Sequence, residues 1–216
     1  IVILTEDNII SYKTGITKYT PCIFEYIYFS RPDSIYNSIP VYEARLNMGL
    51  YLGKKIKNEW SKILPELDMI IPVPDTSRPF CVSIGQVIKK PIREVLIKNR
   101  YIDRTFIMPN QKRRQKNIKR KLNIIPYMVK NKNVLLVDDS IVRGNTSKYI
   151  VSMIRKAGAK NIYLASCAPE IKYSNIYGID IPTQENLIAA TRTNEQIATY
   201  LGVDGLIYQD LNDLND

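Results

Sequence analysis

VLLVDDSIVRGNTS, residues Val134–Ser147, carries the strongest structural signal in this chain. Its first four residues, 134–137, are all apolar, which is typical of a parallel strand buried on both faces. Apolar residues then recur at helical spacing over Thr146–Ala157, and Gly158 is expected to end that helix. A strand, a loop and a helix in this order predict an α/β fold with a central, mostly parallel sheet flanked by helices. The ligand site is then expected at the carboxyl ends of the strands.

The loop within this stretch is suited to a sugar phosphate. Residues 140–146 would present successive backbone N–H groups and a helix N-terminus, which together favour an anion. Asp138 and Asp139 precede the loop, and carboxylates suit sugar hydroxyls or a hard cation such as Mg²⁺. The alternative is a strand-to-helix turn with an incidental acidic pair, because a single glycine loop is a weak signal.

This motif resembles the phosphoribosyl pyrophosphate (PRPP) loop of the type I phosphoribosyltransferases. In that family the two acids bind the ribose 2′- and 3′-hydroxyls and help to place magnesium, and the loop binds the 5′-phosphate. The resemblance therefore implies the ribose and metal roles for Asp138 and Asp139. It also implies a phosphate cradle that consists of Ser140, Ile141, Val142, Arg143, Gly144, Asn145 and Thr146.

The resemblance narrows to the glutamine PRPP amidotransferases. Four further segments are similar to the transferase half of that family, namely residues 22–37, 41–53, 98–111 and 177–189. Members of the family form 5-phosphoribosylamine and pyrophosphate from PRPP and ammonia, the first step of de novo purine biosynthesis. The resemblance implies a pentosyltransferase, an amidophosphoribosyltransferase with the type I phosphoribosyltransferase fold, which uses PRPP and Mg²⁺.

A second loop that carries the resemblance is PVPDTSRPF, residues Pro72–Phe80, after a buried strand expected at 69–73. It is similar to the family's pyrophosphate loop, which implies diphosphate contacts for Thr76 and Ser77 and a magnesium contact for Thr76. A departing diphosphate needs such donors and a metal. The alternative is a proline-rich loop with a helix cap at Thr76 or Ser77. Arg78 stands where the family usually has a small residue, and it would add a phosphate or nucleotide contact.

The segment KNRYIDRTF, residues 98–106, resembles the flexible loop that closes over PRPP, and it follows a strand expected at Pro91–Ile97. The resemblance implies catalytic roles for Lys98, Tyr101 and Arg104. A closed loop would exclude water and leave C1 of PRPP to ammonia. Asp103 stands where the family usually has glycine, so a carboxylate is added and a hinge residue is lost. The alternative is a basic, solvated loop.

The resemblance also divides the chain into two parts. Residues 1–20 are expected to form two short strands around a polar turn, a remnant of the end of a glutaminase domain with its linker. Residues 21–216 are expected to form the phosphoribosyltransferase domain, truncated at its C-terminus. The glutaminase domain is then absent from this chain. It would supply ammonia from glutamine within the full-length chain or in trans, and free ammonia would serve without it.

Composition excludes several kinds of site. The 216 residues contain no histidine, so no imidazole can act as acid, base or metal ligand. The three cysteines lie far apart, which argues against a disulfide framework and fits a reducing cytoplasm. Cys22 matches one ligand of the iron–sulfur cluster that some family members hold, but Asn175 stands at a second ligand position. Because four thiolates are needed, no cluster is expected.

Charge and hydropathy bear on the partners. The net charge of +10 would suit nucleic acid as well as a small phosphorylated substrate. The densest basic run, residues 111–123, lacks the interleaved aromatic residues of a single-strand binding platform, so a solvated helix face is favoured over a nucleic-acid interface. No apolar stretch approaches the roughly 20 residues that span a bilayer, so no membrane contact is expected.

Two further functions compete with the enzyme. The chain would be a PRPP-binding regulatory protein without catalysis, or a decayed remnant of the enzyme, and the departures at Arg78 and Asp103 favour the second of these. For an active member, the resemblance implies purine nucleotides as inhibitors and a homo-oligomer, a tetramer. Ammonia-dependent turnover of PRPP distinguishes the enzyme from both alternatives.

Overall fold

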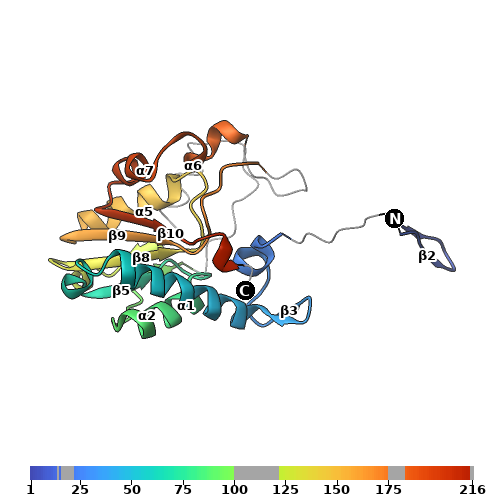
Figure 1. The fold of residues 1–216 in the computed structure, drawn as a ribbon, viewed down its shortest axis with the longest axis horizontal. Coiled ribbons are helices and arrows are strands. Elements are labelled where there is room, and N and C mark those ends of the chain that lie inside the picture. The colour runs from blue at the N-terminus through green and yellow to red at the C-terminus, as the bar shows by residue number, and fades with distance from the viewer. Residues whose placement is uncertain (14, 16–21, 100–121, 175–182, 215–216) are drawn as a thin grey trace.

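Four parallel strands form the central sheet of the computed structural model (Figure 1), which describes residues 1–13, 15, 22–99, 122–174 and 183–214. The strands lie in the order β10-β9-β8-β5 and are β5 (Met69–Pro72), β8 (Asn133–Asp138), β9 (Asn161–Ser166) and β10 (Gly205–Tyr208). Each neighbouring pair is parallel, and Val137 of β8 lies beside Pro72 of β5 and Ala165 of β9. The predicted α/β fold with a parallel sheet is confirmed, and the end of β8 lies beside the end of β5.

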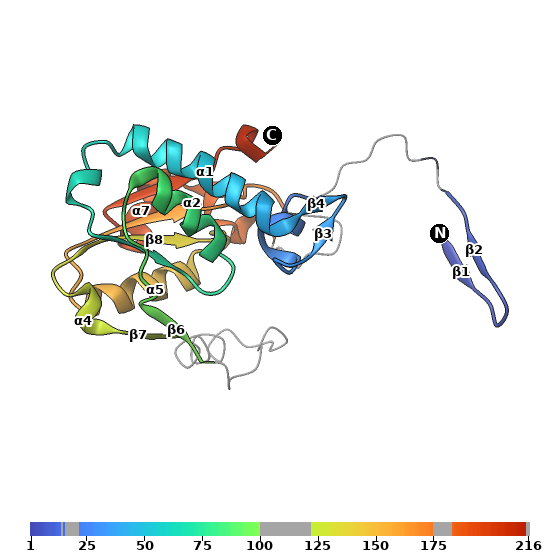
Figure 2. The same cartoon turned by 90° about the horizontal axis from the view of Figure 1, so that it is seen from below.

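Helices cover both faces of the sheet (Figure 2). One face packs against α1 (Val41–Glu59) and α2 (Arg78–Ile88), and the other against α5 (Asn145–Lys156) and α7 (Asn194–Leu201). The side chains of β8 alternate between the two cores. Val134 and Leu136 pack on the side of α5 and α7, and Leu135 and Val137 on the side of α1 and α2. All four are 0% exposed, which explains why this strand is apolar at every one of these positions.

The two helices on one face approach closely at Gly49 of α1. A β-carbon added at Gly49 would lie 2.5 Å from the carbonyl oxygen of Phe80 in α2 and 2.8 Å from its Cα. These are backbone atoms that cannot rotate away, so glycine is required for this approach. Leu52, Ile56 and Ile84 are fully buried in the same core. The start of α2, and with it the loop before α2, is therefore held against α1.

The strand expected at Pro91–Ile97 is not continuous, and this prediction is wrong. Ile92 alone forms a parallel bridge beside β5. The later residues belong to an antiparallel pair, β6 (Leu96–Lys98) and β7 (Leu122–Ile124). Between Ile92 and β6, the N–H of Val95 donates to the carbonyl of Arg93 at 3.0 Å. A hydrogen bond between residues two positions apart turns the chain, so the segment leaves the sheet after one bridge.

The remaining elements of the described residues are short. They are η1 (Glu25–Phe29), β3 (Ile35–Tyr36), β4 (Ile39–Pro40), η2 (Leu64–Glu66), α4 (Pro126–Val129), η3 (Gln184–Asn186), α6 (Ile188–Thr191) and η4 (Asn212–Leu214). At the N-terminus, β1 (Val2–Leu4) and β2 (Ile9–Ser11) are the two short strands expected there. They pair antiparallel, and every residue of both strands is exposed (Figure 1). Among the described residues, no helix has both the length and the apolar character needed to cross a membrane.

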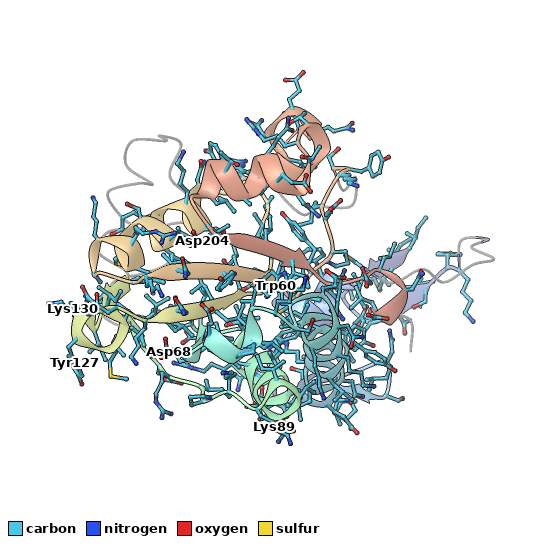
Figure 3. All side chains as sticks on the ribbon, turned by 60° about the vertical axis from the view of Figure 1, so that its left-hand side comes forward. Trp60, Asp68, Lys89, Tyr127, Lys130 and Asp204 are labelled. Atoms are coloured by element: carbon cyan, nitrogen blue, oxygen red, sulfur yellow. The ribbon has the colours of Figure 1, made fainter. Side chains whose placement is uncertain are left out.

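Two carboxylates close the amino-terminal edge of the sheet. Asp68, just before β5, accepts a hydrogen bond from the N–H of Asn133 at 2.8 Å, and Asp204, just before β10, accepts one from the N–H of Ile162 at 2.7 Å. Each acid also forms an ion pair: Oδ1 of Asp68 lies 2.9 Å from Nζ of Lys132, and Oδ2 of Asp204 lies 2.7 Å from NH2 of Arg155. Figure 3 labels both acids on their side of the sheet. These bonds join neighbouring strand starts, so this edge has a structural role.

Candidate functional site

The candidate site lies at the carboxyl ends of β5 and β8, which are neighbours in the sheet. The N–H of Val73, directly after β5, donates to the carbonyl of Val137 in β8 at 2.9 Å. The loop of residues 73–77 therefore starts beside the acidic pair that ends β8, although the two are far apart in the sequence. The structure brings together the two loops that the sequence singled out.

The acidic pair is anchored through its backbone to the next strand. The carbonyls of Asp138 and Asp139 accept hydrogen bonds from the N–H groups of Cys167 and Ala168, both at 2.9 Å. Asp138 is 7% exposed, and its Oδ1 accepts a hydrogen bond from the N–H of Asp139 at 3.0 Å. The hydroxyl of Ser140 donates to Oδ1 of Asp139 at 2.9 Å. Both carboxylates are thus held in place before any ligand arrives.

The electrostatics of this pair favour binding of a cation or of hydroxyl donors. Burial raises the pKa of Asp138 well above its ordinary value of 3.8, and the charge of Asp139 adds to the rise. Burial also raises the pKa of Asp139 to about 6, although the Ser140 hydroxyl, the Arg45 charge and the Thr76 hydroxyl each lower it. Two adjacent buried carboxylates are costly to ionise. A ligand that donates hydrogen bonds to them, or brings positive charge, favours their charged form.

The loop after the acidic pair offers a row of unused donors. The N–H of Ser140 bonds to the carboxylate of Asp139. In the described part of the chain, the backbone N–H groups of residues 141–146 have no hydrogen-bond acceptor. The first helical residue of α5 is Asn145, so the last of these N–H groups belong to the helix N-terminus, whose dipole favours negative charge. Consecutive N–H groups at a helix N-terminus form a binding site for phosphate.

The shape of this loop depends on Gly144. Its φ angle is +74°, and a β-carbon at this position would lie 2.7 Å from Cδ1 of Ile188. Glycine alone adopts this conformation readily and leaves room for the isoleucine. The loop is also tied to α6, because the N–H of Ile188 donates to the carbonyl of Val142 at 3.0 Å. Ile141 is 1% exposed and anchors the loop in the core of α5 and α7.

The second loop contributes the hydroxyl of Thr76. This hydroxyl forms a hydrogen bond with the carboxylate of Asp139, so the two loops meet at that side chain. The hydroxyl of Ser77 is buried and donates to the carbonyl of Val73 at 2.7 Å. Ser77 occupies the N-cap position of α2 but makes no side-chain capping bond there. The bond from its hydroxyl to Val73 therefore closes the loop of residues 73–77 on itself, directly before α2.

A network of ion pairs links the second loop to the start of the expected closing loop. Nζ of Lys98 lies 2.6 Å from Oδ2 of Asp75, and NH1 of Arg78 lies 2.9 Å from Oδ1 of the same carboxylate. Arg78 also pairs with Glu94, with Nε 2.8 Å from Oε1. Arg78, which departs from the family pattern, is therefore held by two carboxylates. Tyr101 and Arg104, the other two catalytic residues expected in the closing loop, lie outside the described residues. So does Asp103, which stands where the family usually has glycine.

Arg45 of α1 is a site residue that the sequence reasoning missed. It is 2% exposed, and its guanidinium donates to the carbonyls of Tyr26 at 2.7 Å and Ser30 at 2.8 Å. Its positive charge also lowers the pKa of Asp139. A signal was present, because Arg45 interrupts the apolar stripe that includes Val41 and Met48 on the buried face of α1. A charged residue on such a face requires a buried partner.

The donor set suits a magnesium ion that is shared with a ligand. In the described part of the chain, no cluster of three or more histidine, cysteine, aspartate or glutamate side chains is assembled. Two carboxylates and a hydroxyl, from Asp138, Asp139 and Thr76, are nevertheless enough, because Mg²⁺ is commonly held by one or two carboxylates together with substrate phosphates. Of the cysteines, Cys81 and Cys167 are buried, and burial raises the pKa of both thiols.

Curated relatives match most of this chain, while no protein-family model matches it. The amidophosphoribosyltransferase of Escherichia coli is 54% identical over 196 residues, which cover 91% of this chain and 38% of that protein. That of Saccharomyces cerevisiae is 50% identical over 202 residues, covering 93% and 39%. That of Methanocaldococcus jannaschii is 39% identical over 230 residues, covering 99% and 47%. The chain therefore spans less than half the length of these curated relatives.

Solved structures match over nearly the whole chain. The glutamine PRPP amidotransferase of Bacillus subtilis, in complex with ADP and GMP, superposes with a TM-score of 0.80 at 37% identity, covering 99% of this chain and 46% of that one. A structure described as the allosteric regulatory enzyme of purine biosynthesis gives a TM-score of 0.80 at 36% identity, covering 99% and 44%. Both likenesses agree with the parallel sheet and its flanking helices.

Proposed function

We propose that this chain, a homologue of the amidophosphoribosyltransferases over nine tenths of its length, is the phosphoribosyl-transferring part of such an enzyme. The reaction is the formation of 5-phosphoribosylamine and pyrophosphate from PRPP and ammonia. One observation carries the proposal: a buried acidic pair, a loop with six unused N–H groups and the loop of Thr76 meet at two adjacent strand ends. These three elements match, in turn, the sugar hydroxyls, the 5′-phosphate and the diphosphate of PRPP.

Each part of PRPP has a partner in this arrangement. Asp138 and Asp139 accept hydrogen bonds from the 2′- and 3′-hydroxyls of the ribose. The 5′-phosphate accepts hydrogen bonds from the N–H groups of residues 141–146, within the cradle implied by the sequence. The diphosphate lies against the loop of Thr76 and Ser77. When bound, Mg²⁺ neutralises charge on the diphosphate, and Asp138, Asp139 and Thr76 would hold it there.

The reaction needs no nucleophile from the protein. Ammonia attacks C1 of the ribose, a C–N bond forms, and the C–O bond to the diphosphate breaks with inversion, so that pyrophosphate leaves with the electron pair. The new amine then loses one proton to solvent. The protein accelerates this displacement by holding the two reactants in line and by stabilising charge on the leaving group.

Closure of the site involves the three residues implied for the flexible loop. In the described structure Lys98 pairs with Asp75 of the second loop. On arrival of the diphosphate, Lys98 exchanges this carboxylate for the more highly charged ligand. Tyr101 and Arg104 then follow from the adjacent loop and exclude water from C1. This step is supported by the position of Lys98 at the end of β6 beside the second loop.

The proposal extends to the rest of the enzyme. Residues 1–20 are assigned to the end of a glutaminase domain and its linker, because β1 and β2 expose apolar side chains such as Val2, Leu4 and Ile9, which need a partner surface. Residues 21–216 form the transferase domain. Glutamine-derived ammonia comes from the glutaminase domain, and purine nucleotides, which the Bacillus subtilis relative holds as ADP and GMP, inhibit the enzyme. The active form is a homotetramer.

The test is pyrophosphate release from PRPP and MgCl₂, measured with and without saturating ammonium chloride. The wild-type chain is compared with the Asp138→Asn/Asp139→Asn double variant and with Asp210→Asn, an exposed acid that serves as the control. Release is expected to depend on ammonium, to fall by at least about a hundredfold in the double variant, and to be unchanged in the control. PRPP binding by the wild-type chain without any release would contradict the proposal and favour a PRPP-binding regulatory protein or a decayed remnant.

A further inference from the structure

Tyr200 of α7 lies directly against the phosphate-binding loop. Its Cε1 atom would be 3.4 Å from a β-carbon at Gly144, so the ring fills the space beside that glycine. Its hydroxyl donates to Oδ1 of Asn145, the first residue of α5, at 3.4 Å. One side chain from α7 therefore contacts both residues at which the loop becomes the helix.

The same ring collects two positive charges. Nζ of Lys148, in the first turn of α5, lies 3.8 Å from the ring centroid, and Cζ of Arg192, just after α6, lies 5.2 Å from it. Both distances are within the range of cation–π interactions. Within the described part of the chain, neither cation forms an ion pair with a carboxylate. Two cations without counter-charges thus share one aromatic ring beside six unused N–H groups.

We propose that Tyr200 is a positioning residue for the phosphate-binding loop, and that it holds Lys148 and Arg192 so that their charges strengthen the binding of the 5′-phosphate end of the ligand. This assignment rests on the proposed function, since it names what sets affinity at one end of that site. The chemical class it serves is a sugar monophosphate, recognised by charge as well as by backbone donors.

The physical reason is preorganisation. A lysine and an arginine on the surface normally move freely, and fixing them on arrival of a ligand reduces the affinity. The ring fixes both before the ligand arrives, and their field adds to that of the helix N-terminus. Because exposed charges are screened by salt, the contribution is expected to weaken as ionic strength rises.

The two ends of the ligand allow a selective test. The 5′-phosphate binds at residues 140–146 and the diphosphate at the loop of Thr76, so ribose 5-phosphate and pyrophosphate with Mg²⁺ report on different ends. Tyr200→Leu removes the ring, and Lys148→Gln/Arg192→Gln removes the charges but keeps the ring. The matched control is Tyr51→Leu, in α1 on the other face of the sheet. It removes a tyrosine ring that also contacts a cation, because Nζ of Lys54 lies 5.0 Å from the ring centroid.

Affinities are measured by isothermal titration calorimetry at low and high salt. Tyr200→Leu and the double variant are each expected to raise the Kd for ribose 5-phosphate about three- to tenfold, which corresponds to one or two exposed cation–π contacts. Pyrophosphate affinity is expected to stay within about twofold of wild type. In both variants the affinity for ribose 5-phosphate should depend less on salt than it does in wild type. Tyr200→Phe is expected to retain most of the affinity, because the ring remains. Tyr51→Leu should leave the Kd for both ligands unchanged.

Two results would overturn the assignment. Ribose 5-phosphate affinity in Tyr200→Leu equal to that of wild type would mean that the ring does not act on the loop. An equal loss of ribose 5-phosphate and pyrophosphate affinity would mean that the substitution damages the whole domain. If the wild-type chain bound neither ribose 5-phosphate nor PRPP, the proposed function would itself be refuted, and the assignment with it.

Discussion

Replacing Asp139 by asparagine should stabilise the unliganded protein at neutral pH, although the carboxylate belongs to the proposed binding site. Burial raises the pKa of Asp139 from an ordinary value of 3.8 to about 6, so between these two pH values the folded state holds a proton that the unfolded state has lost. A shift of one unit corresponds to about 1.4 kcal/mol, so ionising this carboxylate in the folded state opposes folding by about 3 kcal/mol at pH 7. Asparagine removes the charge and keeps an oxygen that the Ser140 hydroxyl can reach.

The pH dependence of this effect has a definite sign. Well below the ordinary pKa of 3.8 the carboxyl is protonated in both states, and the substitution should change the free energy of unfolding little. Between about pH 4 and pH 6 the unfolded chain releases its proton first, so the wild-type protein loses stability as the pH rises. Above the folded pKa the difference from Asp139→Asn is complete. Asp138, whose pKa is also raised by burial, shifts the wild-type curve in the same direction.

The assay is urea unfolding of both proteins at about pH 4, 5, 6 and 7.5, without Mg²⁺ or phosphate. Asp68→Asn is the control of opposite sign. Burial alone would raise the pKa of Asp68, but hydrogen bonds from Asn133 and Lys132 and the Lys132 charge bring the net pKa below its ordinary value. That variant should therefore lose stability at neutral pH and approach wild type in acid. A stability difference between Asp139→Asn and wild type that did not vary with pH would refute the reasoning.

Two further substitutions test the packing that holds the site. Gly49→Ala should lower the free energy of unfolding by about 2 kcal/mol, because the close contact with the Phe80 backbone outweighs the roughly 1 kcal/mol gain in helix propensity. The control is Asn47→Ala, on the exposed face of the same helix, which should be neutral or stabilising. Thr193→Ala should lower the free energy of unfolding by about 1 kcal/mol, because it removes the capping box with Gln196, and Thr193→Ser should keep most of that stability. Urea midpoints measure both variants. An alanine variant as stable as wild type would contradict the role of the cap.

Local signals in the sequence predicted the core of the architecture correctly. The apolar run at 134–137 is a buried strand because both faces of its sheet are covered, and such a strand needs no polar alternation. The helix after it was expected to begin at Thr146 and begins at Asn145. The segment Pro91–Ile97 was misread as one strand, because a turn between Arg93 and Val95 leaves no mark in the apolar pattern.

The sequence by itself determined the chemistry of the individual loops. Asp138 and Asp139 next to a glycine-containing turn indicate sugar phosphate binding whatever the rest of the chain does, because carboxylates and N–H groups are local properties of a short segment. The same holds for the position of Thr76 after a buried strand. Such features need only the residue types and their spacing, both of which are present in the linear chain.

Only the tertiary structure decided which of these loops meet and which other residues join them. Val73 and Val137 become partners because β5 and β8 are neighbours in the sheet, and strand order is not encoded in the periodicity of either strand. The charge of Arg45, from α1, acts on the acidic pair, and Tyr200, from α7, packs beside the phosphate loop; the two helices cover opposite faces of the sheet. The physical reason is that local patterns specify elements, whereas contacts between distant residues follow from how the covered faces of those elements pack together.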